Sequence, residues 1–418
     1  MSDNKKALYI YIYPYKFLDF IWDLWELNEF SEFLNIQVWD LSVLLSKKFD
    51  ESIVIERSKR KEVVVISSVN DFIRNVRTLR KLANTSEICI FNPFATSITM
   101  KDFLCNIIMI LFLKNEKIKV YDAFLGGSPL FNVENKEPYS LRIVRFLQRV
   151  TLKELYYNIF AIVSRKLLKI IPSITKYRLV AGKEWESAAI DNTKIIVKGH
   201  SLDFSGYLRS ECEILSNKES NRNESMLGDY GVFLSSPNPK FGTDDLIGAK
   251  PAPWTSEVWY PALCKFFDRI ERETNTKIEI AGHYRAKFEK NDPLFGYRNV
   301  HYGKTRELIK GAKYVITLGS TAISYAVIYK KPILFIYSNQ LKSHLGAMKG
   351  TKNFADYFGM RPINIDDWGG NLSDYLIVNE ERYKAYESDA LTSTATRRPN
   401  VQIILEDIIG INTQGRFA

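Results

Sequence analysis

The chain of 418 residues is poor in cysteine and histidine, with four of each. Cys89, Cys105, Cys212 and Cys264 share no short spacing and the histidines are scattered, so the sequence shows no metal-ligand pattern. Cys89 and Cys105 lie in apolar runs, which predicts reduced, buried thiols and a cytoplasmic compartment. We therefore expect no metal and no cofactor.

Long hydrophobic runs are also missing. The most apolar run, residues 103–113, contains Asn106 and is too short to span a bilayer, so it predicts a buried helix. Residues 7–13 form a short aromatic strand pattern without a cleavage site, and no signal peptide is expected. The sequence predicts a cytoplasmic protein and leaves open a peripheral association with the inner face of the plasma membrane.

Positive charge is in excess, with a net charge of +10 and a pI of about 9.1. Much of it gathers between Arg142 and Arg178, interleaved with Leu, Ile, Val and Phe. This pattern predicts basic amphipathic helices. They could lie on an anionic membrane, or they could pack on the core and expose their basic face to water. We favour packing on the core. We expect no nucleic-acid partner, because no nucleic-acid-binding motif accompanies the basic residues.

The content of 46% hydrophobic and 13% aromatic residues suffices for two cores. In the first half, strand patterns alternate with helical ones, as a parallel sheet requires. The expected strands are residues 7–13, 36–40, 62–67, 87–91 and 117–121. A polar linker is expected at residues 216–228, and strand patterns resume at Tyr230. The sequence thus predicts an α/β protein with two Rossmann-like parallel-sheet domains facing a cleft.

The most informative stretch is residues 314–337, which reads as one βαβ unit. Its parts are a strand at 315–318, a turn at Gly319, Ser320 and Thr321, a helix at 322–329 and a strand at 332–336. A glycine and two hydroxyls before a helix start predict unpaired backbone N–H groups and hydroxyl donors around one point, which suits a phosphate. The alternative is an ordinary helix cap by Ser320 or Thr321.

Upstream segments add further groups that can address an anion. The strand pattern at residues 277–281 ends just before His283 and Arg285, and a later loop carries Lys304 and Thr305. Ligands of open parallel sheets bind outside the carboxyl ends of the strands. We therefore expect these side chains at a ligand-binding edge.

Residues 277–292 and 300–338 resemble the nucleotide-binding half of GT-B glycosyltransferases that build bacterial surface polysaccharides. They are most similar to the sialyltransferase and Kdo-transferase types, which use CMP-linked acidic sugars and carry a His-Pro pair and a later Ser/Thr pair. His283 matches the first pair, with Tyr284 in place of proline, and Ser320 with Thr321 matches the second. Similar units occur in polyol-phosphate transferases of teichoic-acid synthesis and in nucleotide-sugar 2-epimerases, so the choice of family stays open.

The resemblance implies a metal-independent glycosyltransferase that moves a nonulosonate or Kdo-type sugar from a nucleotide-activated, CMP-linked donor to a surface-glycan or lipid-linked acceptor, as in capsule or lipopolysaccharide synthesis. Alternatives are a CDP-polyol phosphotransferase and a non-catalytic nucleotide-sugar-binding scaffold. The groups expected to bind the donor are Arg285, Lys304, Thr305, Gly319, Ser320 and Thr321, with His283 counted among the catalytic residues.

The strand patterns and the polar linker set the expected domains, and the resemblance adds the place of the last helix. Residues 1–225 would form the acceptor-side domain, with basic amphipathic helices at residues 138–175. Residues 228–390 would form the nucleotide-sugar-binding domain. The last helix, within residues 399–418, would pack back on the first domain.

Glycosyl transfer by inversion needs a general base near the acceptor hydroxyl. The first candidate is Asp122, expected directly after the strand at residues 117–121. The alternative is Asp203, with His200 beside it, and either carboxylate could instead be a turn or linker cap. Asp244 with Asp245 is interpreted as a helix start rather than a metal-binding pair.

Overall fold

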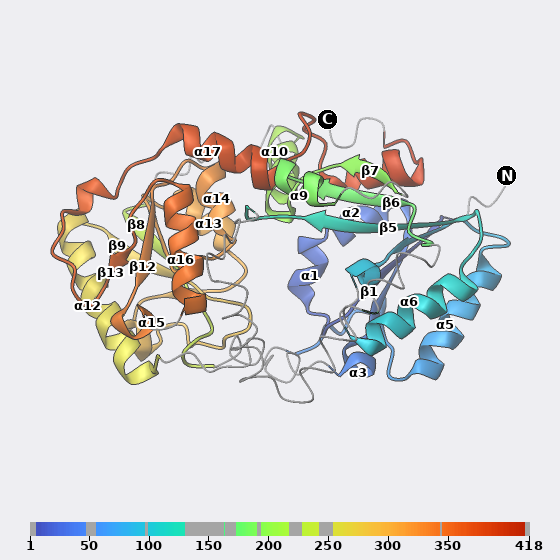
Figure 1. The fold of residues 1–418 in the computed structure, drawn as a ribbon, viewed down its shortest axis with the longest axis horizontal. Helices are drawn as coiled ribbons and strands as arrows, with labels where there is room; N and C mark the ends of the chain where they lie inside the picture. The colour runs from blue at the N-terminus through green and yellow to red at the C-terminus, as the bar shows by residue number, and fades with distance from the viewer. Residues whose placement is uncertain are drawn as a thin grey trace.

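The protein is described by a computed structural model covering residues 6–46, 56–96, 99–129, 163, 173–189, 194–216, 228–241, 254–342 and 345–413. The chain forms two lobes that lie side by side, each built around one sheet (Figure 1). Every strand pairing within the two sheets is parallel. The predicted α/β class with two parallel-sheet domains is confirmed.

The first sheet has seven strands in the order β3-β2-β1-β4-β5-β6-β7. Its strands are β1 (Leu8–Tyr13), β2 (Asn35–Asp40), β3 (Val63–Val65), β4 (Ile88–Phe91), β5 (Ile118–Leu125), β6 (Tyr177–Ala181) and β7 (Ile195–Lys198). Successive strands add on one side up to β3, and then the chain returns to β4 on the other side of β1. This reversal places a topological switch point between β1 and β4, where open sheets bind ligands.

Helices cover both faces of this sheet, so β1 is buried on both sides. Tyr9 and Tyr11 point into one core and Ile10 and Ile12 into the other, because successive side chains of a strand alternate. The helices of this domain are α1 (Asp19–Leu24), α2 (Leu27–Phe33), α3 (Ser42–Leu45), α5 (Val69–Leu82), α6 (Met100–Phe112), α9 (Lys183–Ala188) and α10 (Leu202–Ser216).

The second sheet has six strands in the order β10-β9-β8-β11-β12-β13. Its strands are β8 (Tyr230–Leu234), β9 (Lys277–Ala281), β10 (Val300–His301), β11 (Val315–Thr317), β12 (Ile333–Tyr337) and β13 (Ile363–Asn364). Its helices are α12 (Ser256–Thr274), α13 (Thr305–Gly311), α14 (Ile323–Ile328), α15 (Asn339–Lys342) and α16 (Leu345–Tyr357). Here the strand order reverses between β8 and β11, which is the second switch point.

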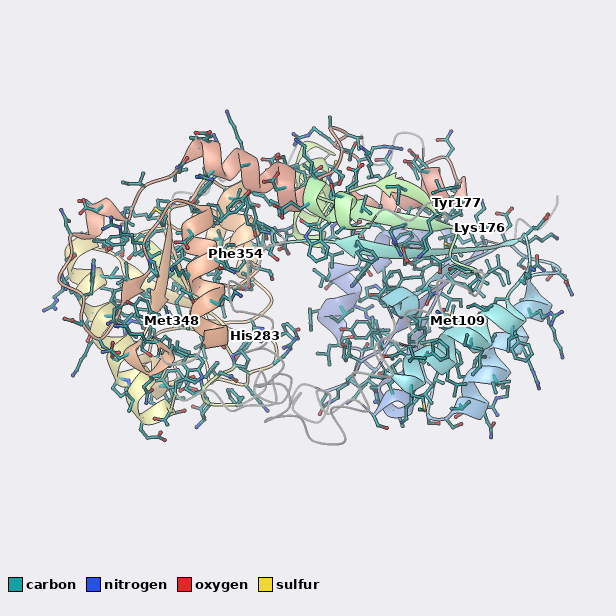
Figure 2. The ribbon with its side chains drawn as sticks, in the orientation of Figure 1. Met109, Lys176, Tyr177, His283, Met348 and Phe354 are labelled. Atoms are coloured by element: carbon teal, nitrogen blue, oxygen red, sulfur yellow. The ribbon has the colours of Figure 1, made fainter. Side chains whose placement is uncertain are left out.

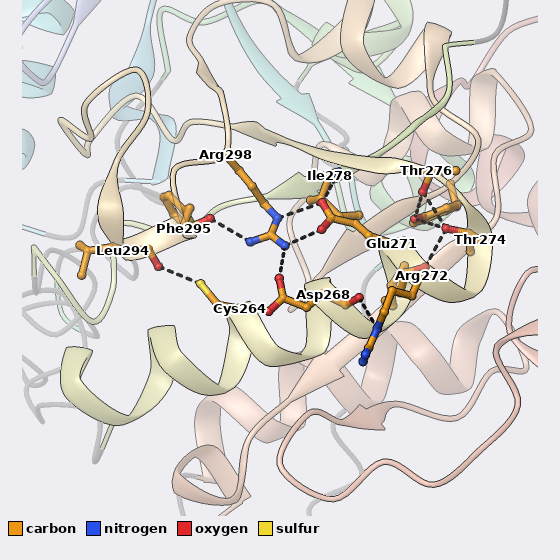
Figure 3. Close-up of polar contacts among 12 residues, drawn as sticks. Cys264, Asp268, Glu271, Arg272, Thr274, Thr276, Ile278, Leu294, Phe295 and Arg298 are labelled. Carbon is orange, nitrogen blue, oxygen red and sulfur yellow. Dashed lines mark hydrogen bonds and ion pairs between the residues drawn. The ribbon is translucent and has the colours of Figure 1, made fainter.

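An ion-pair cluster holds α12 against the segment between β9 and β10 (Figure 3). The guanidinium of Arg298 binds both carboxylate oxygens of Glu271, at 3.0 and 2.6 Å, and one oxygen of Asp268 at 2.6 Å. Its remaining nitrogen donates to the carbonyl of Phe295 at 3.1 Å. The fork geometry of arginine suits such a set of acceptors, and the acceptors raise the pKa of Arg298 despite its partial burial.

The chain returns to the first domain at its C-terminal end. Helix α17 (Glu380–Tyr386) continues into the π-helical turn η4 (Glu387–Leu391), and helix α18 (Asn400–Ile403) continues into η5 (Ile404–Ile409). Figure 1 shows these red segments running from the second lobe across to the first. Val401, Leu405 and Ile408 are buried in the same core as Tyr9, so the last helix completes the core that the first strand begins.

Several expected bounds differ from the observed ones. β5 extends through Leu125, whereas the sequence predicted an end at residue 121. α12 begins at Ser256 and carries Pro261 inside it, because Trp259 and Tyr260 belong to its buried face. Residues 242–253, with Asp244 and Asp245, nearly all of the basic stretch at 138–175 and residues 217–227 of the expected linker lie outside the described residues. No helix in the described ranges is long and apolar enough to cross a membrane.

Candidate functional site

The carboxyl ends of β8, β9 and β11 meet at the switch point of the second sheet. Ser235 follows β8, His283 lies two residues beyond β9, and Gly319 lies two residues beyond β11. β9 and β11 flank β8, so their ends are about 10 Å apart at the usual strand spacing. The predicted βαβ motif and His283 are therefore brought to one edge of the sheet.

His283 is fixed on this edge through its backbone and one ring nitrogen. Its N–H donates to the hydroxyl of Ser235 at 3.0 Å, and its Nδ1 accepts the N–H of Arg285 at 3.2 Å. Burial, helped by the nearby Arg285 charge, lowers the pKa of His283 to about 4. The ring is thus neutral at pH 7 and carries its proton on Nε2, because Nδ1 is used as an acceptor. In this state His283 can donate a hydrogen bond through Nε2.

Tyr284, with Arg285 beside it, links this edge to the first domain. The ring of Tyr284 stacks on His283 with centroids 4.6 Å apart, and its other neighbour is Phe20 of α1, also at 4.6 Å. The Nε of Arg285 donates to the hydroxyl of Tyr284 at 3.0 Å. Because α1 follows β1, the carboxyl edges of the two sheets face each other, and His283 lies on the side of its lobe toward the first domain (Figure 2).

The turn at Gly319 differs from the expectation of unpaired N–H groups. The hydroxyl of Thr317 accepts the N–H of Gly319 and of Ser320, each at 3.0 Å, and the hydroxyl of Ser320 accepts the N–H of Ala322 at 3.2 Å. Gly319 has φ of 134°, which only glycine adopts without strain. The turn is therefore held by its own side chains, and α14 begins at Ile323 rather than at residue 322.

Ser320 and Thr321 remain accessible in this turn. Ser320 is half-buried and Thr321 is exposed, in contrast with the fully buried Thr317. Their hydroxyls can donate to an anion by rotation, since a hydroxyl hydrogen adapts to its acceptor. With the N–H groups of Gly319, Ser320 and Ala322 already paired, these hydroxyls are donors that the turn offers.

Lys304 and Thr305 lie at the end of β10, the outermost strand of the sheet. Lys304 is exposed at the N-terminal cap position of α13, and Thr305 is the first residue of that helix. β9 and β8 separate this end from β11. The two residues therefore belong to the edge of the sheet and not to the switch point.

The position of Asp122 differs from the predicted one. It lies within β5 rather than after it, and its side chain is 3% exposed. Its carboxylate binds the guanidinium of Arg178 at 2.8 and 2.7 Å and the ammonium of Lys194 at 2.7 Å. A carboxylate occupied by two buried cations and closed to solvent is poorly placed to take a proton from an acceptor, so this geometry indicates a structural ion-pair centre joining β5, β6 and the start of β7.

His200 and Asp203 lie where the two domains join. His200 is fully buried, with Nδ1 2.9 Å from the hydroxyl of Thr392 and Nε2 3.1 Å from the carbonyl of Arg398. Burial lowers the pKa of His200 to about 4. Asp203 accepts a hydrogen bond from Ser324 of α14, and burial raises the pKa of its carboxyl. Both residues tie segments together rather than face the switch point.

Ser235 was not among the predicted site residues. It is 6% exposed and orients His283 through the backbone hydrogen bond. Its position in the sequence could have predicted it, because Ser235 directly follows the first strand of the second domain. The first βα loop of a doubly wound sheet lies at the switch point.

Two doubly wound parallel sheets with facing carboxyl edges, and a last helix returned to the first domain, define a GT-B architecture. No protein-family model and no curated protein sequence matches the chain.

Solved structures with a similar course of the chain include UDP-GlcNAc 2-epimerase from Methanocaldococcus jannaschii, with 12% identity, TM-score 0.43 and coverage of 97% of this chain and 100% of that one. The MnaA–UDP complex of S. aureus has 11% identity, TM-score 0.44 and 98% coverage of both chains. The wall teichoic acid polymerase TagF has 11% identity, TM-score 0.48 and coverage of 97% and 89%. These sequence identities and TM-scores are low, so the description of the fold rests on the chain's own topology.

Proposed function

We propose that this chain is a glycosyltransferase that binds a nucleotide-activated sugar at the carboxyl edge of its second sheet. The observation that supports the proposal is the place of His283 at the switch point, where Nδ1 accepts the N–H of Arg285 and Nε2 can donate to a ligand. In the proposal this donor meets a phosphate of the nucleotide. The turn at Gly319, on the other side of β8, offers the hydroxyls of Ser320 and Thr321 to the same ligand.

These groups suit the charge that develops in glycosyl transfer. As the bond from the sugar to the phosphate breaks, negative charge grows on the phosphate oxygens, and fixed donors that already point at them stabilise that state. His283 is fixed by Ser235 and by the N–H of Arg285, so its ring needs little reorientation. Arg285 adds a positive charge on the same loop.

The acceptor would lie on the first domain. The residues that follow β1 precede α1, whose Phe20 contacts Tyr284, so the loop at residues 14–18 borders the proposed donor site. In the proposal, the acceptor hydroxyl approaches from this side, and the two domains shield the reacting atoms from water. Asp122, buried and paired with Arg178 and Lys194, is poorly placed to be its base.

For the donor we propose a CMP-linked acidic sugar of the nonulosonate or Kdo type, and for the acceptor a surface glycan or a lipid-linked glycan. The support is the match of His283 and of Ser320 with Thr321 to the motifs of that class. A CDP-linked polyol donor and a binding protein without turnover are the other outcomes that the experiment distinguishes.

The test is thermal-shift binding of CMP, CDP, UDP and GDP to the purified protein, because a ligand that binds only the folded state raises the unfolding temperature. We expect the largest shift with CMP and a loss of at least tenfold in affinity for His283→Ala. His301→Ala is the matched control, since this histidine lies on β10 and binds Glu279 at 2.7 Å. A loss in the control equal to that in His283→Ala, or no shift with any nucleotide, would contradict the proposal.

Turnover separates the remaining outcomes. We expect a Ser320→Ala, Thr321→Ala double variant to retain its fold and to lose donor turnover, measured as release of CMP from a CMP-sugar. Binding of CMP without turnover in the wild-type protein would favour the scaffold. A shift with CDP and release of CMP from a CDP-polyol would instead favour the phosphotransferase.

A further inference from the structure

Helix α6 carries apolar side chains on its outer side as well as on its inner side. Met109, labelled in Figure 2, belongs to the inner side and is fully buried. On the outer side, Met100, Leu104 and Leu111 are 49%, 41% and 67% exposed. Large apolar side chains gathered at this exposure are uncommon on the surface of a soluble protein and mark a contact surface.

The three exposed residues form one stripe along the helix. Positions 100, 104 and 111 lie within about 40° of one another around an α-helix, and they span about 16 Å along its axis. Ile107 lies between them on the same stripe and is half-buried. The stripe is thus continuous, and it runs most of the length of the helix.

The neighbouring helix α5, packed beside α6 in the same lobe, shows the ordinary pattern (Figure 1). Its side chains Phe72 and Val76 are buried, while Arg80 and Lys81 on its outer side are exposed. α5 therefore meets water mainly with charged groups, with one exposed apolar side chain at its end, Leu82, which is 41% exposed. α6 departs from this pattern although it packs beside α5 on the same sheet. The apolar stripe is therefore a property of α6 and is not shared by its neighbour.

Positive charge borders the stripe. Lys101 is exposed at the start of α6 and its ammonium donates to the carbonyl of Leu44 at 2.8 Å. The guanidinium of Arg77 lies 5.1 Å above the ring of Phe112 at the other end. The acidic residue of α6, Asp102, is buried in the capping box with Thr99.

Helix α3 also carries an exposed apolar side chain, because Val43 is 44% exposed. Lys101 links α3 to α6 through its contact with Leu44. α3 follows β2 and the start of α6 follows β4, so this end of the surface lies toward the carboxyl edge of the first sheet. That edge is the one that faces the second domain.

We propose that this surface, formed by Val43, Met100, Leu104 and Leu111 with Lys101 and Arg77 at its border, docks on a membrane that contains anionic lipids. The apolar side chains enter the boundary between headgroups and acyl chains, and the cations meet the headgroups. A two-fold pairing of the same surface on a second copy would bring the cations that border one copy close to those that border the other, which is unfavourable. The charges thus favour an anionic lipid surface over a second copy.

The biological purpose of this docking surface rests on the proposed function. A protein docked through α3 and α6 holds the carboxyl edge of its first sheet beside the lipid surface, where a lipid-linked acceptor would be available. Vesicle binding is measured without donor, acceptor or turnover. The failure of the docking surface and the failure of the proposed reaction are therefore distinguishable.

The test is flotation of the full-length protein with two kinds of vesicle. One contains phosphatidylcholine with about 30% phosphatidylglycerol, which gives a strong negative surface potential, and the other contains phosphatidylcholine alone. We expect binding to the anionic vesicles, and at least a tenfold loss of partitioning in a Leu104→Glu, Leu111→Glu double variant. Ile377→Glu is the matched control, because Ile377 is 54% exposed in the second domain. It should bind as the wild-type protein does.

A second measurement does not depend on charge substitutions. Leu111→Trp places a fluorophore on the stripe, and we expect lipids brominated on their acyl chains to quench its added fluorescence, whereas Ile377→Trp should not be quenched. Equal vesicle binding by the double variant and the wild type, or no quenching at Leu111→Trp, would overturn the proposal. So would a wild-type dimer that the double variant dissolves and that binds no vesicles, because the occupant would then be a second copy.

Discussion

The carboxylate of Asp203, in the first turn of α10, accepts a hydrogen bond from the hydroxyl of Ser324 in α14, and Tyr325 is a second donor to it. α10 follows the last strand of the first sheet, and α14 follows the turn at Gly319. The guanidinium of Arg306 joins the same region by donating to the carbonyl of Gly206 at 3.0 Å. One carboxylate thus fixes the proposed phosphate-binding turn relative to the first domain.

We expect Asp203→Ala to lower the free energy of unfolding by about 1–3 kcal/mol, because it leaves the hydroxyls of Ser324 and Tyr325 without their acceptor. Ser324→Ala should cost less, because Asp203 keeps its hydrogen bond from Tyr325. Urea unfolding at pH 7 measures both. Equal stability of Asp203→Ala and the wild-type protein would show that the contact does not hold the domains together.

Asp122→Asn should act first on stability. The substitution removes the charge that compensates Arg178 and Lys194, whose side chains are 8% and 5% exposed, and uncompensated buried charges cost about 3–5 kcal/mol. Adding Lys194→Met should recover part of the loss, because one of the two cations is then absent. Chemical denaturation measures the effect. Full stability combined with loss of transfer would instead return Asp122 to the role of general base.

The stability of the protein should fall as the pH drops from 6.5 toward 4. His200 has a pKa of about 4 in the folded protein, below the ordinary value of 6.5, so in this interval the unfolded chain binds a proton that the folded chain does not. The corresponding loss is about 2–3 kcal/mol at pH 4. Denaturation midpoints between pH 7 and 4.5 should show this slope, and His200→Gln should reduce it without abolishing it, because the pKa of His283 is also lowered to about 4. An unchanged slope in the variant would assign it to other groups.

Arg298→Leu should destabilise the second domain by about 1–3 kcal/mol, since Glu271 and Asp268 lose a shared partner whose side chain is only 10% exposed. Arg298→Lys should not restore the loss, because an ammonium cannot reproduce the two-pronged contact with Glu271. Arg272→Leu, at an exposed position of the same helix, is the control. Thermal unfolding that ranks all three variants alike would contradict this account.

The sequence was sufficient for the sheets because buried parallel strands are short, almost unbroken apolar runs. Residues 7–13 predicted the strand observed at Leu8–Tyr13, and residues 277–281 coincide with β9. β5 was predicted too short because Asp122 breaks its apolar run. The partners that allow a charge inside this strand are Arg178 and Lys194, far along the chain, and no local pattern contains them.

The candidate site was predicted as far as it depends on strand ends. His283 and the turn at Gly319 follow recognisable strands, and the structure brings them to one edge. The place of Lys304 at the end of the outermost strand, β10, could not be predicted, because strand order is a tertiary property. The buried positions of His200 and Asp203 depend on α14 and on Thr392, segments that the sequence alone does not place beside them.

The return of the C-terminal helix has a consequence for biosynthesis. Val401, Leu405 and Ile408 share a core with Tyr9 and Phe30, so the first domain lacks one side of that core until residues 401–408 have been translated. The second domain, by contrast, holds the sheet and helices of its own core within the chain that precedes this helix. The usual order, in which the N-terminal domain folds first during synthesis, is therefore reversed at its last step: the domain made first is the one completed last.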